Sequence, residues 1–212
     1  MTTSRWEDVR RLEAWAGEVR VNLIRTAALV VFFAYHLIHV HFLDTALRGS
    51  RFDAVVTVVV LAWALAVALL HTLLSRRLVP PSLKYLATAW DLTMITVLLL
   101  ADPRGGPHSP LVVLYFLVIA AAPLRLSLPL VYAATLGAML AATVMMGGYV
   151  FGVVGTTDYY DPSKGYQVPR TSEVIFLLAL GAAGLFAGQV VRQARRVAEG
   201  YPVRVVEERE AA

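Results

Sequence analysis

Apolar residues occur along this chain in long runs, separated by short polar segments. Runs near the length needed to cross about 30 Å of hydrocarbon predict six membrane-spanning helices, at 22–43, 54–75, 83–101, 110–126, 128–148 and 173–191. The fourth run is short and contains Pro123, and Arg125 lies in the abrupt connection LRLSLP that follows it. We therefore expect the fourth and fifth helices to form one tight hairpin.

Composition supports a membrane location. Of the 212 residues, 58% are hydrophobic and only 16% are charged, and the mean hydropathy is +0.64. This is more apolar surface than a soluble domain of that size usually buries. The predicted fold is therefore all-α, a polytopic six-helix transmembrane bundle. The chain has no cysteine, which excludes disulfides and thiolate metal sites.

The distribution of lysine and arginine predicts the orientation. With the N-terminus inside, five of the 19 basic residues fall outside, namely Arg48, Arg51, Arg104, Lys164 and Arg170. The positive-inside rule then places both termini in the cytoplasm, and we expect a multi-pass protein of the bacterial inner membrane. This arrangement accounts for the net charge of +4, so nucleic acid is not expected as a partner.

The segments outside the spans define three parts of the chain. Residues 1–21 carry an apolar stripe with arginines around it, which predicts an interfacial amphipathic helix lying at the headgroups, with a soluble docking helix as the alternative. The stripe consists of Trp6, Val9, Leu12, Trp15 and Val19. Residues 22–191 form the membrane domain. Residues 192–212 are expected to form a basic cytoplasmic helical tail, interrupted at Gly200 and Pro202.

Two glycines in the sixth span have the spacing at which helices approach closely. Gly184 and Gly188 lie four residues apart in GAAGLFAG, a small-xxx-small pattern. The pattern suits packing within the chain and equally suits a homodimer.

Histidines gather near the outer end of the first span. His36 and His39 share a helical face, whereas His41 projects to the other side. Together with His108 of the following outer loop, His36 and His39 form a potential zinc or copper site. The alternative is that these histidines only form hydrogen bonds at the interface.

A haem site is not favoured by the positions of the histidines. His71 lies near the inner end of the second span. It is therefore about 20 Å or more from the His36 cluster along the membrane normal, whereas two histidine ligands of one haem need similar depth on facing helices.

Asp91 stands inside the third span, in the sequence AWDLT. An ionised carboxylate is costly there, so Asp91 is expected to face the bundle interior and to find a polar partner. Thr88, Tyr115 and a residue of the first span are the candidates. A transporter is not favoured, because the sequence shows no repeated half, second buried charge or broken helix pair.

The loop after the third span reads GGPHSPL, at 105–111. With the six-span layout and Asp91, it resembles the membrane sensor region of RegB/PrrB-type redox-sensing histidine kinases, whose loop reads Gly-Gly-x-x-Asn-Pro-Phe and is associated with quinone binding. Gly105, Gly106 and Pro110 match that pattern, while Ser109 replaces the asparagine and Leu111 the phenylalanine. The kinase core of that family has no counterpart here. The sensor regions of PilS-type kinases have a similar layout without a clear quinone role.

The resemblance implies a quinone as the cofactor and a pocket in the outer half of the bundle. His36 or His39, Asp91, His108, Ser109 and Tyr115 are expected to converge there beneath the Gly105–Gly106 loop. The predicted function is a non-enzymatic sensor module that binds a quinone or a similar apolar ligand. It would signal through the last helix to a cytoplasmic partner.

Two other functions are compatible with the sequence. One is a non-catalytic integral subunit of a larger respiratory or photosynthetic complex, in which other membrane subunits and the lipid bilayer surround the helices. The other is a membrane protein that binds haem, zinc or copper.

The orientation can be tested at the two lysines of the chain. Lys164 belongs to the 149–172 segment, whose tyrosines suit a lid at headgroup level, and Lys84 lies at the inner end of the third span. A membrane-impermeant amine reagent applied from outside should label Lys164 and spare Lys84. Labelling of Lys164 only from the cytoplasmic side would overturn the predicted topology.

Overall fold

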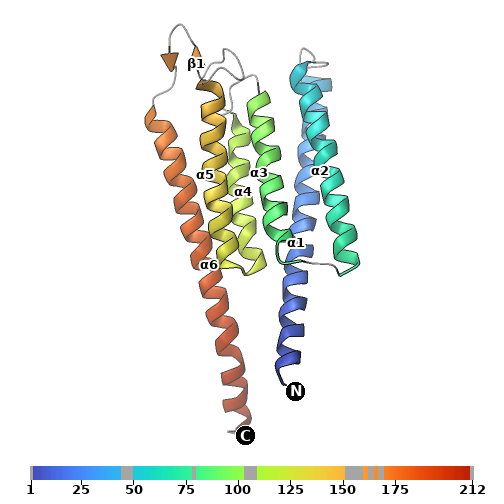
Figure 1. Ribbon diagram of the computed structural model, residues 1–212, viewed down its shortest axis with the longest axis vertical. Coiled ribbons are helices and arrows are strands. Elements are labelled where there is room, and N and C mark those ends of the chain that lie inside the picture. Colours follow the sequence, from blue (N-terminus) through green and yellow to red (C-terminus); the bar gives the residue numbers. More distant parts are fainter. Residues whose placement is uncertain are drawn as a thin grey trace.

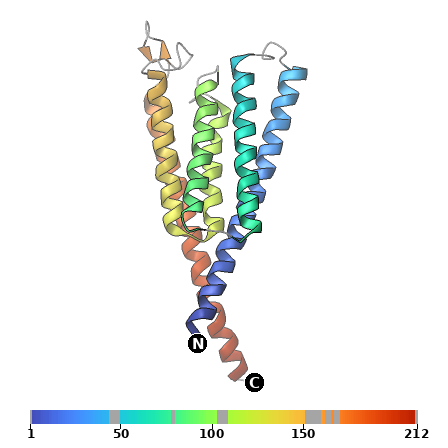
Figure 2. The same cartoon turned by 45° about the vertical axis from the view of Figure 1, so that its right-hand side comes forward.

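The computed structural model describes residues 2–43, 50–77, 80–102, 109–150, 160–161, 165–166 and 170–210. These are almost entirely helical and form one elongated bundle (Figure 1), which confirms the all-α class. The long helices are α1 (Thr2–Ile38), α2 (Arg51–Ser75), α3 (Leu83–Ala101), α5 (Leu128–Val150) and α6 (Arg170–Glu210), with the short α4 (Leu114–Ala121) between α3 and α5. Successive helices alternate in direction, so both termini lie at one end, called here the terminal end (Figure 2).

Short elements complete the described chain. A π-helical turn η1 (His39–Leu43) follows α1, and 3-10 turns η4 (Pro110–Val113) and η5 (Ala122–Arg125) flank α4. Two two-residue strands, β1 (Tyr160–Asp161) and β2 (Gly165–Tyr166), pair antiparallel at the other end, called the loop end.

The predicted spans correspond closely to the observed helices. Within the described residues, five helices are long and apolar enough to cross a membrane: Trp15–Phe42, Arg51–Ser75, Leu83–Ala101, Leu128–Tyr149 and Arg170–Val197. The shorter apolar segment Pro110–Arg125 is the fourth predicted run. The hairpin between the fourth and fifth runs is confirmed, because η5 is followed by Leu126 with a left-handed φ of 49° and α5 begins at Leu128.

The expected boundary between residues 21 and 22 is not present. Helix α1 continues without a break from Thr2 to Ile38, so its amphipathic start extends the first long helix and does not form a separate helix lying across it. Two described residues near the end of this region pack against other parts of the bundle. The Trp15 indole donates to the Leu74 carbonyl at 2.9 Å, and a Cβ at Gly17 would lie 3.2 Å from the Leu124 carbonyl oxygen.

Two other expectations about the helix ends were wrong. Helix α6 runs through Gly200 and Pro202 to Glu210; an internal proline removes one hydrogen bond of the helix, and the neighbouring arginines and glutamates are good helix formers. Tyr149, expected in an outer lid, belongs to α5 and is fully buried, with its hydroxyl donating to the Leu99 carbonyl at 2.7 Å.

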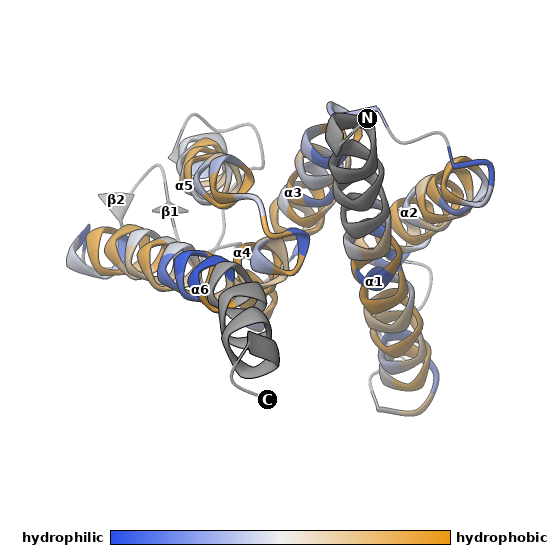
Figure 3. Cartoon of the chain, turned by 90° about the horizontal axis from the view of Figure 1, so that it is seen from below, coloured by the Kyte–Doolittle hydropathy of each residue, from blue (hydrophilic) through white to orange (hydrophobic). Residues whose placement is uncertain are grey.

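The helices pack as two groups joined at α3. The larger core lies among α3, α4, α5 and α6 and includes Ile95, Tyr115, Leu130 and Leu180. A smaller core joins α2 to α3 through Val56, Val60 and Leu98 and is flanked by α1. Seen from the terminal end, α1 and α2 form one side of the bundle and α5 and α6 the other (Figure 3).

The glycine pattern of α6 faces α5. A Cβ added to Gly184 would overlap the Thr135 side chain, and one added to Gly188 would contact Leu128 and Tyr132. Packing within the chain therefore accounts for both glycines. The homodimer remains a prediction.

Substitutions at these glycines should separate close packing from helix propensity. Gly184→Ala forces its methyl group onto Thr135 and should destabilise the bundle by about 1–3 kcal/mol, the usual cost of overpacking. In Gly181→Ala the nearest atom to the new methyl would be Met139 Sδ at 4.0 Å, so this control should be neutral or slightly stabilising. Thermal unfolding in detergent measures both, and equal melting temperatures would contradict the packing.

Candidate ligand-binding site

A buried ion pair connects α1 to α3. Arg25 donates from Nε to Asp91 Oδ1 at 2.8 Å and from Nη2 to Asp91 Oδ2 at 2.5 Å. The Trp63 indole of α2 donates to the same carboxylate at 2.9 Å. The side chains of Arg25 and Asp91 are only 6% and 10% exposed. The carboxylate therefore has a compensating charge and donors from two other helices.

Local sequence explains why these side chains meet. Asp91 lies on the buried face of α3 with Ala87, Thr88 and Leu92. Arg25 lies on the face of α1 that carries Val21, which is also buried, because residues four apart share a helical face. The apolar surroundings exclude water, so each charge is best satisfied by the other.

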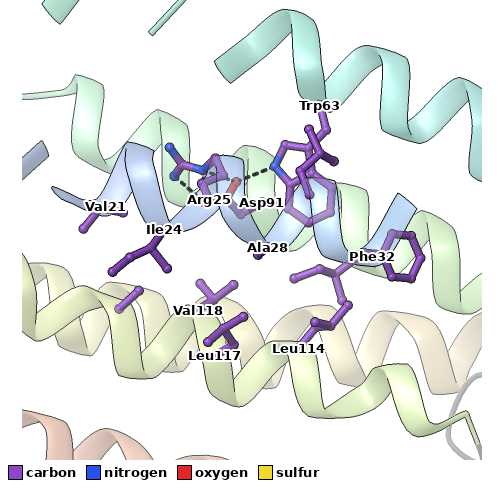
Figure 4. Close-up of a pocket in the computed structure, with 13 residues that line it drawn as sticks. Val21, Ile24, Arg25, Ala28, Phe32, Trp63, Asp91, Leu114, Leu117 and Val118 are labelled. Carbon is purple, nitrogen blue, oxygen red and sulfur yellow. Dashed lines mark hydrogen bonds and ion pairs between the residues drawn. The ribbon is translucent and has the colours of Figure 1, made fainter. Parts of the chain in front are cut away.

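An open apolar cleft borders this pair, between α1 and α4 (Figure 4). The cavity holds about 70 Å³ and is open on one side. Its walls are Val21, Ile24, Ala28 and Phe32 on α1 and Leu114, Leu117 and Val118 on α4, with Arg25, Asp91 and Trp63 also among the lining residues. The cleft thus combines apolar walls with a few polar groups, the usual composition of a small-ligand site.

The ion pair gives this cleft hydrogen-bond donors without net charge. Asp91 neutralises Arg25, yet the guanidinium has five N–H groups. Nη1 makes one long contact, 3.5 Å to Asn22 Oδ1, so the guanidinium retains donor capacity. A neutral ligand with a carbonyl oxygen suits this environment better than an anion, which would compete with Asp91.

No family model matches the chain, and no curated protein or solved structure is found to be similar to it.

The described members of the predicted outer pocket make separate contacts. His36 Nε2 lies 3.0 Å from Asp53 Oδ1 of α2, and the Tyr115 hydroxyl lies 2.9 Å from Thr96 Oγ1. Ser109 is 1% exposed and accepts from the Leu111 N–H at the start of η4. The structure therefore does not bring these three side chains to Asp91.

Several predicted ligands lie outside the described residues. These are Gly105, Gly106, His108 and the side chain of His39; Pro110 is described and exposed at the start of η4. Within the described part of the chain, no group of three or more histidine, aspartate or glutamate side chains is placed to hold a metal ion. The predicted metal site of His36, His39 and His108 stays a prediction, because His108 and the His39 side chain lie outside the described residues.

Sequence reasoning missed Arg25 as the partner of Asp91. Arg25 was assigned to the basic inner side, although it lies within the first predicted span, 22–43. A charge inside a predicted span is itself a signal of a buried partner. Of the three candidate partners, Thr88, Tyr115 and a residue of the first span, the structure pairs Asp91 with the last.

A second buried charge pair lies closer to the terminal end. Arg125 of η5 approaches Glu18 of α1, with Nε 3.0 Å from Oε1, and its Nη1 donates to Thr88 Oγ1 at 2.9 Å. Both side chains are under a tenth exposed. The expectation of a single buried charge was therefore wrong, because Arg25, Glu18 and Arg125 are buried as well. Glu18 and Arg25, two helical turns apart, attach α1 to η5 and α3.

Breaking the Arg25–Asp91 pair should cost more than removing it. Asp91→Asn leaves the Arg25 charge uncompensated in the interior and should destabilise the fold by about 3–5 kcal/mol. The double variant Arg25→Met/Asp91→Leu replaces both charges with apolar groups and should recover most of that loss. Unfolding in a denaturing detergent measures the difference. If the double variant is no more stable than Asp91→Asn, the claim that the two charges mainly compensate each other is contradicted.

Proposed function

We propose that this chain is a membrane-embedded binding module of the bacterial inner membrane, with both termini in the cytoplasm. Large apolar side chains point outward from the bundle, among them Leu61, Leu65, Leu136, Leu185 and Phe186, each more than 60% exposed. In water such a surface would aggregate, whereas lipid covers it without cost. The bias of arginine toward the terminal end supports the orientation.

The proposed ligand is a quinone or a similar neutral, largely apolar molecule with a carbonyl group. The observation that carries this proposal is the α1–α4 cleft, whose apolar walls adjoin the Arg25–Asp91 pair. A ring would lie between Ile24 or Ala28 on one side and Val118 on the other. A carbonyl oxygen would accept from Arg25, and the open side of the cleft would admit an apolar tail.

The resemblance to quinone-associated sensor regions agrees with this ligand class but placed the site in the outer loop. The proposed cleft shares Asp91 with that prediction and replaces its histidines with Arg25 and Trp63. His108, Gly105 and Gly106 stay predictions for the loop.

A sensor role follows from the helices that border the cleft. Helix α1 forms one wall and continues to Thr2 at the terminal end, and α6 likewise continues to Glu210. A ligand that binds better when α1 stands away from α4 would shift the position of α1, since only differential affinity shifts a conformational equilibrium. We propose α1 as the primary output helix and α6, the helix predicted from sequence, as the second.

Membership of a larger membrane assembly is the second candidate function. It is favoured by the same open cleft, because a helix of another subunit would cover its apolar walls. The ligand experiment distinguishes the two, since an assembly subunit has no reason to bind a free quinone.

The ligand can be tested with adjacent alanines of α1. Ala28 lines the cleft, whereas Ala27 is exposed and does not. Ala28→Phe should fill the cleft and weaken binding of a short-chain benzoquinone by about tenfold or more, the loss of roughly 1.4 kcal/mol. Ala27→Phe should bind as the unmodified protein does. Quenching of tryptophan fluorescence measures the affinity, because Trp63 lines the cleft.

The polar contact is tested separately with Arg25→Met/Asp91→Leu. This variant keeps an apolar interior and loses the donor, so it should bind the quinone more weakly while retaining its shape. Equal affinity of all these proteins would contradict the site, and no saturable binding to any of them would favour the assembly role.

A further inference from the structure

A second groove lies between α1 and α2 at the terminal end. It holds about 480 Å³ and is lined mainly by Trp15, Val19 and Leu23 of α1 and by His71, Leu74 and Ser75 of α2. Both walls carry apolar and polar side chains, so the groove is amphipathic.

This groove is distinct from the α1–α4 cleft. Val19 and Leu23 occupy the face of α1 opposite Val21 and Ala28, as the helical period of 3.6 residues requires. Arg25 and Asp91 line the cleft and do not line the groove. Substitutions in one site can therefore be made without touching the other.

Exposed arginines flank the groove on both helices. Arg20 and Arg76 follow the lining residues Val19 and Ser75 directly, and both are exposed. The nearby carboxylate of Glu18 is buried and paired with Arg125. The two arginines therefore present charge that this carboxylate does not offset.

Depth along the groove matches the order of groups in a phospholipid. Ser75 and Arg76 end α2 at headgroup level, and the Trp15 indole bonded to Leu74 is typical of that level. His71 is exposed one turn deeper, where it can donate to an ester carbonyl. Leu23 extends further and suits an acyl chain.

We propose that this groove binds one anionic phospholipid, with its phosphate at Arg76 and at the tip of the Arg20 side chain, its ester groups at His71 and one acyl chain along Leu23. Arg20 lies one residue further from the terminal end than Val19, and its side chain leans back toward that end, as helical side chains do. Basic pockets between membrane helices on the cytoplasmic side commonly take such headgroups. Because the lipid would contact both α1 and α2, it would also stabilise their pairing at this end.

Native mass spectrometry of the delipidated protein can test the proposal. The probes are dioleoyl phosphatidylglycerol and, as the neutral comparison, dioleoyl phosphatidylcholine. The first phosphatidylglycerol should bind at least about fivefold more tightly than phosphatidylcholine, the worth of one or more arginine contacts. Arg20→Gln/Arg76→Gln should abolish this preference, whereas Arg192→Gln/Arg196→Gln on α6, with the same change in charge, should keep it.

A steric pair of variants tests the groove itself. Val19→Trp fills the groove and should weaken the first lipid site, whereas Val30→Trp, on an exposed position of the same helix outside the groove, should not. Equal binding of the two lipids would overturn the proposal, because the bound molecules would then be ordinary annular lipid. An effect of the arginine variants without an effect of Val19→Trp would overturn it as well. A dimer of the delipidated chain that Val19→Trp abolishes would also contradict it, because the groove would then hold a second copy.

Discussion

Two opposite charges, Arg25 on α1 and Asp91 on α3, meet inside a bundle that is otherwise largely apolar. Separating a buried charge from its partner is costly in such surroundings, so α1 is held against α3 at this point. Trp63 adds a donor from α2 to the same carboxylate, and three helices are thus fixed by one group. The apolar cleft exists beside this junction because the junction holds α1 to α3 and leaves α4 standing apart from it.

The two sides of the bundle are held together by different forces. Helices α5 and α6 approach closely through Gly184 and Thr135 and share a continuous apolar core with α3 and α4. Helix α1 reaches α3 and η5 through charged groups, Arg25 to Asp91 and Glu18 to Arg125. Charged contacts respond more strongly than apolar packing does to an added hydrogen-bond donor or acceptor. A ligand carbonyl beside Arg25 would therefore act on α1 rather than on the group of helices from α3 to α6.

Periodicity and length predicted the helices well, since apolar runs of membrane length have few alternatives to helix. The tight turn at Pro123 and Arg125 was also predictable from its residues. The partner of Asp91 was predictable only as a residue of the first span, because an arginine near a predicted helix start reads equally as an interfacial anchor. The contacts of His36 and Tyr115 could not be predicted. Their polar groups lie within hydrogen-bond distance of Asp53 and Thr96, and sequence does not reveal which polar neighbour will be closest.

The central claim, that the α1–α4 cleft is the ligand site, is tested most directly by photo-crosslinking. A quinone carrying a photoreactive azide on its ring, bound to the purified protein and irradiated, should label peptides that contain Ile24 or Ala28 of α1 and Leu117 or Val118 of α4. Excess unlabelled quinone should suppress that labelling. Saturable labelling confined to α5, α6 or the loop at 103–109, with these α1 and α4 residues unmodified, would contradict the account.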